Sequence, residues 1–407
     1  MSSERAECVV VGISDLWTFD ADRQAPHGRL HDAAVAFRHG CVSWVGPSSE
    51  APEADRVVDG RGTIALPGLV DCHTHSLFAG SRADEFARRL AGATYAEILE
   101  AGGGILSTVR ATRAASDDEL AATLTARLDD MLTRGVTTVE VKTGYGLHPD
   151  HELRHLRVIA GVDAGPRVVP TFLGAHAVPL EWRDDREAYL DLLVDQMIPA
   201  AAALGAAVDV YCDRGAYTLD EARRVLEAGR AHGAVIKAHA EQIEHTGVAA
   251  LAAELGAASA DHLERIDEAG IAAMAEAGTV AVLLPGARTY LHDPSPPVPA
   301  LREAGVPLAV ATDFNPGSSP VRDLLACATL ACLDMGLTIP EALAGITVNA
   351  AKALARPELG WIGPGSAGDL ALFHPPPGEP ARAESLVQYL GGHRAHHVLR
   401  AGRVVHG

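Results

Sequence analysis

Short apolar segments with strand character alternate with helical segments through the middle of the chain. Eight such pairs follow one another between residues 66 and 361. Alternation of this kind favours a parallel sheet, and eight units are the number that closes a (β/α)8 barrel. We therefore predict an α/β fold with a TIM-like barrel over 66–361. The alternative is an open doubly wound sheet, which would have a glycine-rich phosphate loop after its first strand. Here the first strand, within 66–75, runs into His73-Thr74-His75 instead.

The predicted barrel strands are short runs rich in Val, Leu, Ile and Ala, and the segments between them have the length of helices. The strands are expected at 69–71, 136–142, 167–172, 207–212, 234–239, 258–262, 279–284 and 308–313. The helices are expected at 116–133, 150–161, 186–203, 218–231, 246–255, 267–277, 298–304, 320–335 and 339–354.

Both ends of the chain have β character. Apolar runs broken by glycine and proline occur at 8–12, 34–37, 42–46, 369–373 and 397–405. Such runs predict short antiparallel strands, and Ala401-Gly402 predicts a hairpin turn inside the last of them. We infer that 1–65 and 362–407 together form one small β-sandwich domain beside the barrel.

The composition argues against several classes of partner. A formal charge of −19 does not fit a nucleic-acid surface, which needs a basic patch. No apolar run has membrane-spanning length without glycine, proline or charge, so no membrane association is expected. The six cysteines form no CxxC pair and no secretory signal is recognised, which predicts a reduced, cytoplasmic setting. A small anionic substrate stays compatible, because one buried arginine can bind it locally.

Polar residues mark the C-terminal ends of the predicted strands, where barrel enzymes carry their chemistry. They are His73 and His75, Lys142 to Tyr145, His176, Asp213, His239, His262 and Asp313. Five histidines and two aspartates at the same end of a barrel would meet at one mouth. This convergence predicts a metal site.

Four of these residues form a plausible ligand set. His73 and His75 are two residues apart, so both point to one face of a strand and can bind one divalent ion. With His239 and Asp313 they supply three nitrogens and one oxygen, which suits zinc or iron. Such an ion brings the pKa of a bound water near neutrality. Asp313 can also take a proton, and His262 can shuttle protons or polarise a carbonyl. A structural hydrogen bond is the alternative role for His262.

We expect one metal ion rather than two. Two-metal barrels often use a carboxylated lysine as a bridge, and Lys142 is a lysine at a strand end. It follows the second strand, however, and the fourth strand ends in Cys212-Asp213 without a lysine. Lys142 is therefore expected to line the pocket or to form an ion pair, for example with Glu140.

A rival metal motif lies at 151–155. His151-Glu152-Leu-Arg-His155 matches HExxH, which places two imidazoles on one face of a helix. This helix is a barrel crossover with no obvious third ligand, so we interpret the motif as a solvated polar face. The other histidine cluster, at 393–397, is expected at the surface of the terminal β region.

Several loop residues are candidates for substrate binding. The Arg82 guanidinium can hold a carboxylate in a bidentate pair, and a loop salt bridge to Asp84 or Glu85 is the alternative. Tyr145 lies between two glycines, which either place its hydroxyl over a pocket or simply make a turn. In the loop at 313–319, Asn315 and Ser318 can offer hydrogen bonds and Gly317 an exposed backbone N–H.

Longer motifs join these residues: LPGLVDCHTHSLFAGSR, AGATYAEILEAGGGILSTVRATR, VEVKTGYGL, TFLGAHAVP, KAHAEQ, SADHLE, TVAVLLPG and ATDFNPGSSP. On these motifs the chain resembles the imidazolonepropionase family of the amidohydrolase superfamily over almost its whole length. TDFNPGS together with KTGYGL and FLGAH is far more specific than HTH alone. The prolines and histidines of 374–398 depart from the family pattern, in the terminal β region.

The resemblance implies a reaction and its residues. It implies hydrolytic ring opening of 4-imidazolone-5-propanoate to N-formimidoyl-L-glutamate in histidine degradation, by a homodimer with one Zn2+ or Fe3+ ion per subunit. The implied metal ligands are His73, His75, His239 and Asp313. The implied substrate contacts are Arg82, Tyr145, His176, Gln242, Asn315, Gly317 and Ser318. The implied catalytic residues are His262, Asp313 and Gln242. Glu also occurs at position 242 in the family, so the glutamine here leaves a carboxylate base unassured.

Two other functions are kept as alternatives. A related deaminase of an aminated heterocycle would use the same metal, water and His262, and a carboxylate-anchoring Arg82 argues against it. A non-catalytic barrel that serves as a scaffold would typically have lost metal ligands, whereas this chain has the whole set.

Overall fold

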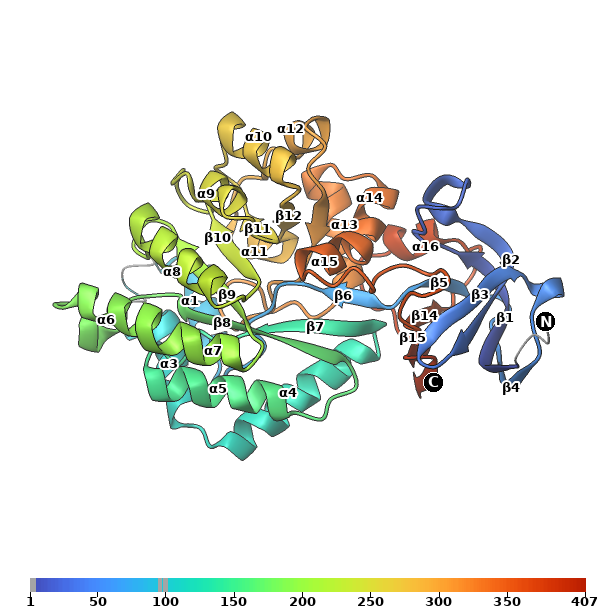
Figure 1. The fold of residues 1–407 in the computed structure, drawn as a ribbon, viewed down its shortest axis with the longest axis horizontal. Coiled ribbons are helices and arrows are strands. Elements are labelled where there is room, and N and C mark those ends of the chain that lie inside the picture. Colours follow the sequence, from blue (N-terminus) through green and yellow to red (C-terminus); the bar gives the residue numbers. More distant parts are fainter. Residues whose placement is uncertain (1–4, 94–96, 98–101) are drawn as a thin grey trace.

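A computed structural model describes residues 5–93, 97 and 102–407, so part of the AGATYAEILEAGGG motif lies outside the described residues. The predicted parallel barrel is confirmed: eight strands follow one another in sequence order and every neighbouring pair is parallel (Figure 1). They are β6 (Leu69–Asp71), β7 (Val136–Lys142), β8 (Arg167–Ala175), β9 (Ala207–Cys212), β10 (Ile236–Ala240), β11 (Ser259–His262), β12 (Val280–Leu283) and β13 (Leu308–Val310).

The residues just beyond the first and last strands close the barrel. Thr74 forms a parallel bridge with Phe314. The Asp313 N–H donates to the His73 carbonyl at 3.0 Å, and the His75 N–H donates to the Phe314 carbonyl at 2.9 Å. Closure therefore places the HTH segment directly beside the segment that begins with Asp313.

Helices surround the barrel, and sequence signals explain several of their ends. They are α1 (Ala83–Leu90), α3 (Ile105–Ala114), α4 (Asp117–Leu132), α5 (Pro149–Gly161), α6 (Arg186–Leu192), α7 (Ile198–Ala203), α8 (Leu219–Ala231), α9 (Val248–Glu254), α10 (Glu268–Ala277), α11 (Pro285–Leu291), α12 (Val298–Glu303), α13 (Leu324–Met335), α14 (Ile339–Gly345), α15 (Val348–Ala353) and α16 (Ala383–Gln388). Ser116 and Glu119 form a capping box that starts α4. The helix predicted at 339–354 is interrupted at Thr347, whose backbone is not helical.

A second sheet joins the two ends of the chain, as predicted. Its order is β16-β15-β14-β5-β1-β2-β3, with β4 also paired to β1, and both termini lie on this side of the barrel (Figure 1). The strands are β1 (Ala6–Leu16), β2 (Leu30–Arg38), β3 (Cys41–Pro47), β4 (Ala54–Asp59), β5 (Ile64–Pro67), β14 (Leu370–Phe373), β15 (Ala395–Arg400) and β16 (Arg403–His406). The predicted hairpin is present: Ala401 and Gly402, both with positive φ, connect β15 to β16.

The segment 66–75, which contains the first predicted barrel strand, is divided between the two sheets. β5 pairs with β14 in the terminal sheet, and β6 pairs with β7 in the barrel. The change takes place at Gly68, where an added Cβ would lie 2.2 Å from the Thr137 hydroxyl oxygen. Glycine is needed there because the backbone passes so close to β7. The expected domain boundary between residues 65 and 66 stays a prediction.

Within the described parts of the chain, no helix combines the length and the apolar character that crossing a membrane requires.

The HExxH motif occupies α5, but its interpretation as a solvated face is wrong. Glu152 and His155 are fully buried. Both ring nitrogens of His155 lack a hydrogen-bond partner. Burial, with the nearby Arg154 charge, lowers the pKa of His155 to about 3. The motif does not gather three metal-binding side chains among the residues that the structure describes.

His155→Leu should change how stability depends on pH. The folded-state pKa of His155 lies below its unfolded value, so the unfolded chain binds the proton and native stability is lost as pH falls below about 6.5. By pH 5 this costs about 2 kcal/mol for one fully buried imidazole. Leucine cannot titrate and breaks no hydrogen bond. Thermal unfolding should therefore show a variant that gains stability relative to the wild type between pH 7 and pH 5. A constant difference across this range would contradict the prediction.

Candidate metal centre and substrate cavity

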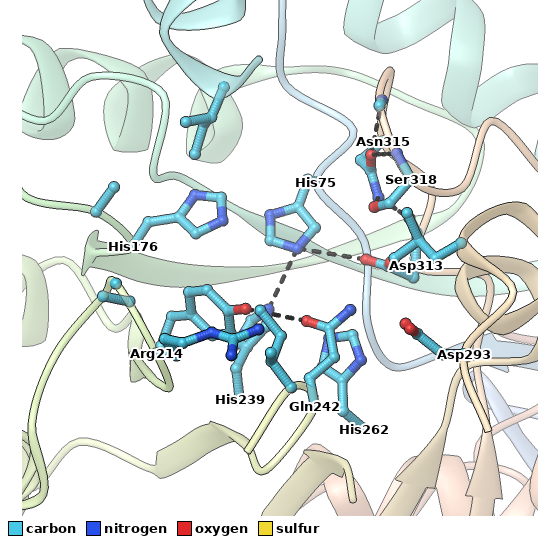
Figure 2. Close-up of a pocket in the computed structure, with 18 of the residues that line it drawn as sticks. His75, His176, Arg214, His239, Gln242, His262, Asp293, Asp313, Asn315 and Ser318 are labelled. Atoms are coloured by element: carbon cyan, nitrogen blue, oxygen red, sulfur yellow. Dashed lines mark hydrogen bonds and ion pairs between the residues drawn. The ribbon is translucent and has the colours of Figure 1, made fainter. Parts of the chain in front are cut away.

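A cavity of about 720 Å3 opens at the C-terminal ends of the barrel strands (Figure 2). Its wall contains most of the residues predicted from the sequence. It is lined by, among others, His75, Arg82, Tyr145, His176, His239, Gln242, His262, Asp313, Asn315, Gly317 and Ser318. His73 lies just beneath, fully buried. The cavity is therefore lined from all eight barrel strands or the loops that follow them.

The four predicted metal ligands lie together at the inner end. The Nε2 atoms of His75 and His239 are 3.3 Å apart. Asp313 Oδ1 lies 3.5 Å from Nε2 of His73 and 3.5 Å from Nε2 of His75. Ligands at 2.0–2.1 Å around a tetrahedral ion stand about 3.3–3.4 Å from one another. These separations fit one ion at the centre.

Carboxylates behind two of the histidines decide which of their ring nitrogens face the centre. His73 Nδ1 is 2.6 Å from Asp261 Oδ2, and His239 Nδ1 is 3.1 Å from Asp209 Oδ2. A carboxylate can only accept, so both Nδ1 atoms carry the proton and both Nε2 atoms present lone pairs. The buried His73 Nε2 has no hydrogen-bond partner and faces another acceptor, Asp313. The lone pairs of these two atoms are directed at one another with no donor between them, and a cation bound between them would stabilise this arrangement.

A network of buried charges supports these carboxylates. Lys142 Nζ lies 2.7 Å from Asp209 and 2.9 Å from Glu140, which confirms the expected ion pair with Glu140. Lys237 Nζ lies 2.8 Å from Glu140 and 3.7 Å from Asp261. All five side chains are completely buried. Lys142 is beneath the cavity and does not line it.

The electrostatics keep the imidazoles neutral. Burial lowers the pKa of His73, His75 and His262 well below the ordinary value, and that of His176 to about 4. Burial also raises the pKa of Asp313 well above its usual range. Neutral imidazole is the form that binds metals, and a buried carboxylate without a nearby positive charge is costly, so the set gains from a cation.

His262 lies beside the four ligands. Its ring centroid is 5.5 Å from that of His239 and 5.8 Å from that of His73. Two groups of three side chains have possible ligand atoms within 4.8 Å of one another. One is His73, His75 and Asp313, and the other is His73, His239 and His262. His262 and Asp313 have φ of +82° and +51°. Such strained backbone at non-glycine residues is typical of functional sites.

Arg82 has the salt bridge that the sequence offered as its alternative role, and it also lines the cavity. Its Nε is 2.9 Å from Glu85 Oε2, and its Nη2 pairs with Glu85 Oε1. Gly317 lies against the guanidinium, where an added Cβ would be 2.0 Å from Arg82 Nη1. Arg89 donates to the Gly317 carbonyl at 3.1 Å. Arg82 and Arg89 therefore stand together at the outer part of the cavity, and Arg214 is a third arginine of its lining.

The loop after β13 differs in one respect from the expectation. The Asn315 side-chain oxygen accepts the N–H groups of Gly317 and Ser318 at 2.8 and 2.7 Å. Its amide nitrogen donates to the Asp313 carbonyl at 2.7 Å. The prediction of an exposed Gly317 N–H is wrong, because Asn315 already binds it.

One wall of the cavity consists of Tyr145, His176, Tyr211 and Gln242. His176 stacks on His75 with ring centroids 5.1 Å apart (Figure 2). Tyr211 donates its hydroxyl to Gln242 Oε1 at 3.1 Å. Gln242 also bonds to Asp293, another cavity residue. The wall thus presents polar groups that are already oriented.

Comparison with known proteins identifies the family to which the chain belongs. A model of the amidohydrolase family matches residues 64–405. The imidazolonepropionase of Cupriavidus necator is 49% identical over 394 residues, covering 95% of this chain and 93% of that protein. That of Geobacillus kaustophilus is 45% identical over 396 residues, covering 94% and 92%. The chain belongs to the amidohydrolase family, among the imidazolonepropionases. A zinc-bound adenosine deaminase from Xanthomonas campestris has TM-score 0.74 at 19% identity, covering 98% of this chain and 93% of that one, a likeness of fold alone.

Sequence reasoning misplaced one residue of this amidohydrolase site and missed others. Asp213 does not line the cavity; its carboxylate accepts the N–H groups of Arg214, Ile243 and Glu244. Asp209, Lys237 and Asp261 were missed. The available signal was a charged residue inside an otherwise apolar strand, two positions from another polar residue. Lys237 and His239 have this spacing.

Asp261→Asn should weaken metal binding. The amide removes the negative charge that makes the His73 imidazole a better donor, while its oxygen can still accept the Nδ1 proton. Loss of such an outer carboxylate lowers metal affinity about 10–100-fold. Competition with a chelator, followed by elemental analysis, measures the effect. Asp184→Asn, an exposed aspartate, is the matched control. An affinity within twofold of the wild type would remove Asp261 from this role.

Proposed function

We propose that this chain hydrolyses the cyclic amide C–N bond of 4-imidazolone-5-propanoate and produces N-formimidoyl-L-glutamate, a step of histidine degradation. One observation carries the proposal: a single cavity combines a donor set for a metal ion at its inner end with arginine at its outer part. The imidazolonepropionases that match over 95% of the chain support the same substrate. The partner is thus a small molecule with a carboxylate.

One Zn2+ or Fe3+ ion per subunit is held by His73, His75, His239 and Asp313. When bound, the ion supplies Lewis acidity and a water whose pKa lies near neutrality. Asp209 and Asp261 keep Nδ1 of two ligands protonated, so that Nε2 points to the centre. Zinc in the related fold of an adenosine deaminase is compatible with this assignment.

The residues of the chain then bind and turn over the substrate. Arg82 binds the propionate through two parallel N–H groups, exchanging Glu85 for the substrate carboxylate. Tyr145, His176 and Gln242 orient the ring above the histidines. Asn315, Gly317 and Ser318 shape the opposite wall and contact the opened product.

Proton transfer completes the reaction. Asp313 accepts the proton of the attacking water, whose oxygen forms a bond with the ring carbonyl carbon. The C–N bond to that carbon breaks, and the proton taken up by Asp313 passes through His262 to the departing nitrogen. One water molecule is consumed, and the carbonyl becomes a carboxylate. Gln242 cannot act as a base, so its role is to hydrogen-bond the ring.

We further propose that the enzyme is a homodimer of the cytoplasm, with each subunit divided into 1–65 with 362–407 and a barrel over 66–361. The six cysteines are free thiols, which supports a reducing compartment. The dimer follows the family resemblance and is tested by light scattering of the purified protein.

The reaction is tested with freshly prepared imidazolone propionate. The ring chromophore should disappear faster than its spontaneous rate, and enzyme stripped by a chelator should lose this activity and regain it with zinc or iron. Elemental analysis should find about one ion per subunit. Ammonia release from an aminated heterocycle, without ring opening, would favour the deaminase alternative. Full activity without metal would overturn the proposed chemistry.

Arg82→Ala should raise KM about 10–100-fold, the loss of a charged hydrogen-bonded pair, and leave the bound metal unchanged. Because this change leaves Glu85 unpaired, the double variant Arg82→Ala with Glu85→Gln controls for repulsion of the substrate carboxylate. Arg88→Ala, an exposed arginine on the helix that follows Arg82, should have wild-type kinetics. Unchanged KM in both Arg82 variants would exclude Arg82 as the carboxylate anchor.

A further inference from the structure

Glu152, the central acid of the HExxH motif, has an unusual set of partners. Its carboxylate lies in the first turns of α5, completely buried. Oε1 accepts the backbone N–H groups of Gly146 and Leu147, both at 2.7 Å, and Oε2 accepts that of Gly144 at 3.1 Å. Three backbone N–H groups of one loop therefore point at a single side chain.

The loop at 143–147 is built around this carboxylate. Gly144 and Leu147 have φ of +106° and +47°. An added Cβ at Gly146 would lie 2.8 Å from Glu152 Oε1. A second side chain binds the loop from the other side: Arg113 donates to the carbonyls of Gly146 at 2.6 Å and Leu147 at 3.0 Å. An anion on the N–H groups and a cation on the carbonyls fix the backbone.

Two cavity residues depend on this loop. Tyr145, in its middle, is only 4% exposed and forms part of the cavity wall. The Gly144 carbonyl accepts a hydrogen bond from Nδ1 of His176 at 3.0 Å. That bond leaves Nε2 of His176 as an acceptor. The orientations of both rings are thus tied to the backbone that Glu152 binds.

We propose that Glu152 is a positioning residue that sets Tyr145 and His176 for substrate binding, with Arg113 as its counterpart on the loop carbonyls. The inference rests on the proposed function, since the two rings are assigned there to the substrate. Glutamate suits the task because only a carboxylate has acceptor sites on both oxygens. In glutamine one end is a donor, so either the Gly144 N–H or the pair at Gly146 and Leu147 would face another donor.

Glu152→Gln should therefore raise KM about tenfold, the loss of one hydrogen bond to a charged group, with bound metal unchanged. Arg113→Lys, which cannot bind two carbonyls in the same way, should move KM in the same direction. His151→Gln is the matched control on the same helix and should leave KM and metal content unchanged. Loss of metal in the His151 and Glu152 variants together would instead identify the motif as a metal site and overturn the proposal.

A double-mutant cycle separates positioning from general destabilisation. If Glu152 acts through Tyr145, the variant Glu152→Gln with Tyr145→Phe should have the KM of the worse single variant. Effects on KM that multiply would show that Glu152 does not act through this tyrosine. Hydrogen exchange at 143–147 gives a readout that needs no activity: Glu152→Gln should lose protection there, and wild-type protection would contradict the clamp. Failure of the wild-type ring-opening assay, with this loss present, would count against the proposed function alone.

Discussion

A buried network of two lysines and three carboxylates underlies the centre of the barrel. Its members, Lys142, Lys237, Glu140, Asp209 and Asp261, are all without solvent contact, so each charge must be compensated inside the protein. The lysines balance two of the three carboxylates. Burial alone would lower the pKa of Lys142, but the Asp209 and Glu140 carboxylates raise it above the ordinary value and keep the ammonium charged. The negative charge left over, together with Asp313, is what a divalent ion would neutralise.

Barrel closure gives that charge its geometry. The hydrogen bonds between His73 and Asp313, and between His75 and Phe314, are backbone bonds of the first and last strand ends. They therefore hold ligands that are about 240 residues apart in sequence, as His73 and Asp313 are, at a spacing set by the sheet and not by the side chains. The backbone thus sets the spacing of these ligands, and a preorganised ligand set is the arrangement that gives a site both affinity and selectivity.

The sequence predicted the parts of this structure that depend on local pattern. The bounds of β7 and β9 match the expected runs because both are valine-containing segments with glycines close to each end. What it could not predict are relations across the fold. Gly68 separates β5 from β6, and glycine is required there because Thr137 of β7 lies against its backbone. From the sequence, Glu152 resembles a surface residue of an amphipathic helix, and its burial depends on contact with the loop that contains Tyr145. Asp209 and Asp261 carried a signal, a charge within an apolar strand, that becomes specific only once their lysine partners are known.

The distribution of charge along the cavity explains why a substrate would bind in one direction. The inner end has an excess of hydrogen-bond acceptors. These are the Asp313 carboxylate and the histidine Nε2 atoms that face the centre, and the buried carboxylates lie beneath them. Three arginines also line the cavity: Arg82 pairs with Glu85, Arg89 donates to a backbone carbonyl, and Arg214 pairs with Glu244. A carboxylate is therefore repelled from the depth of a metal-free cavity and attracted to its outer part. A ring joined to a propionate would enter ring first, which places its carbonyl next to the centre without any motion of the barrel.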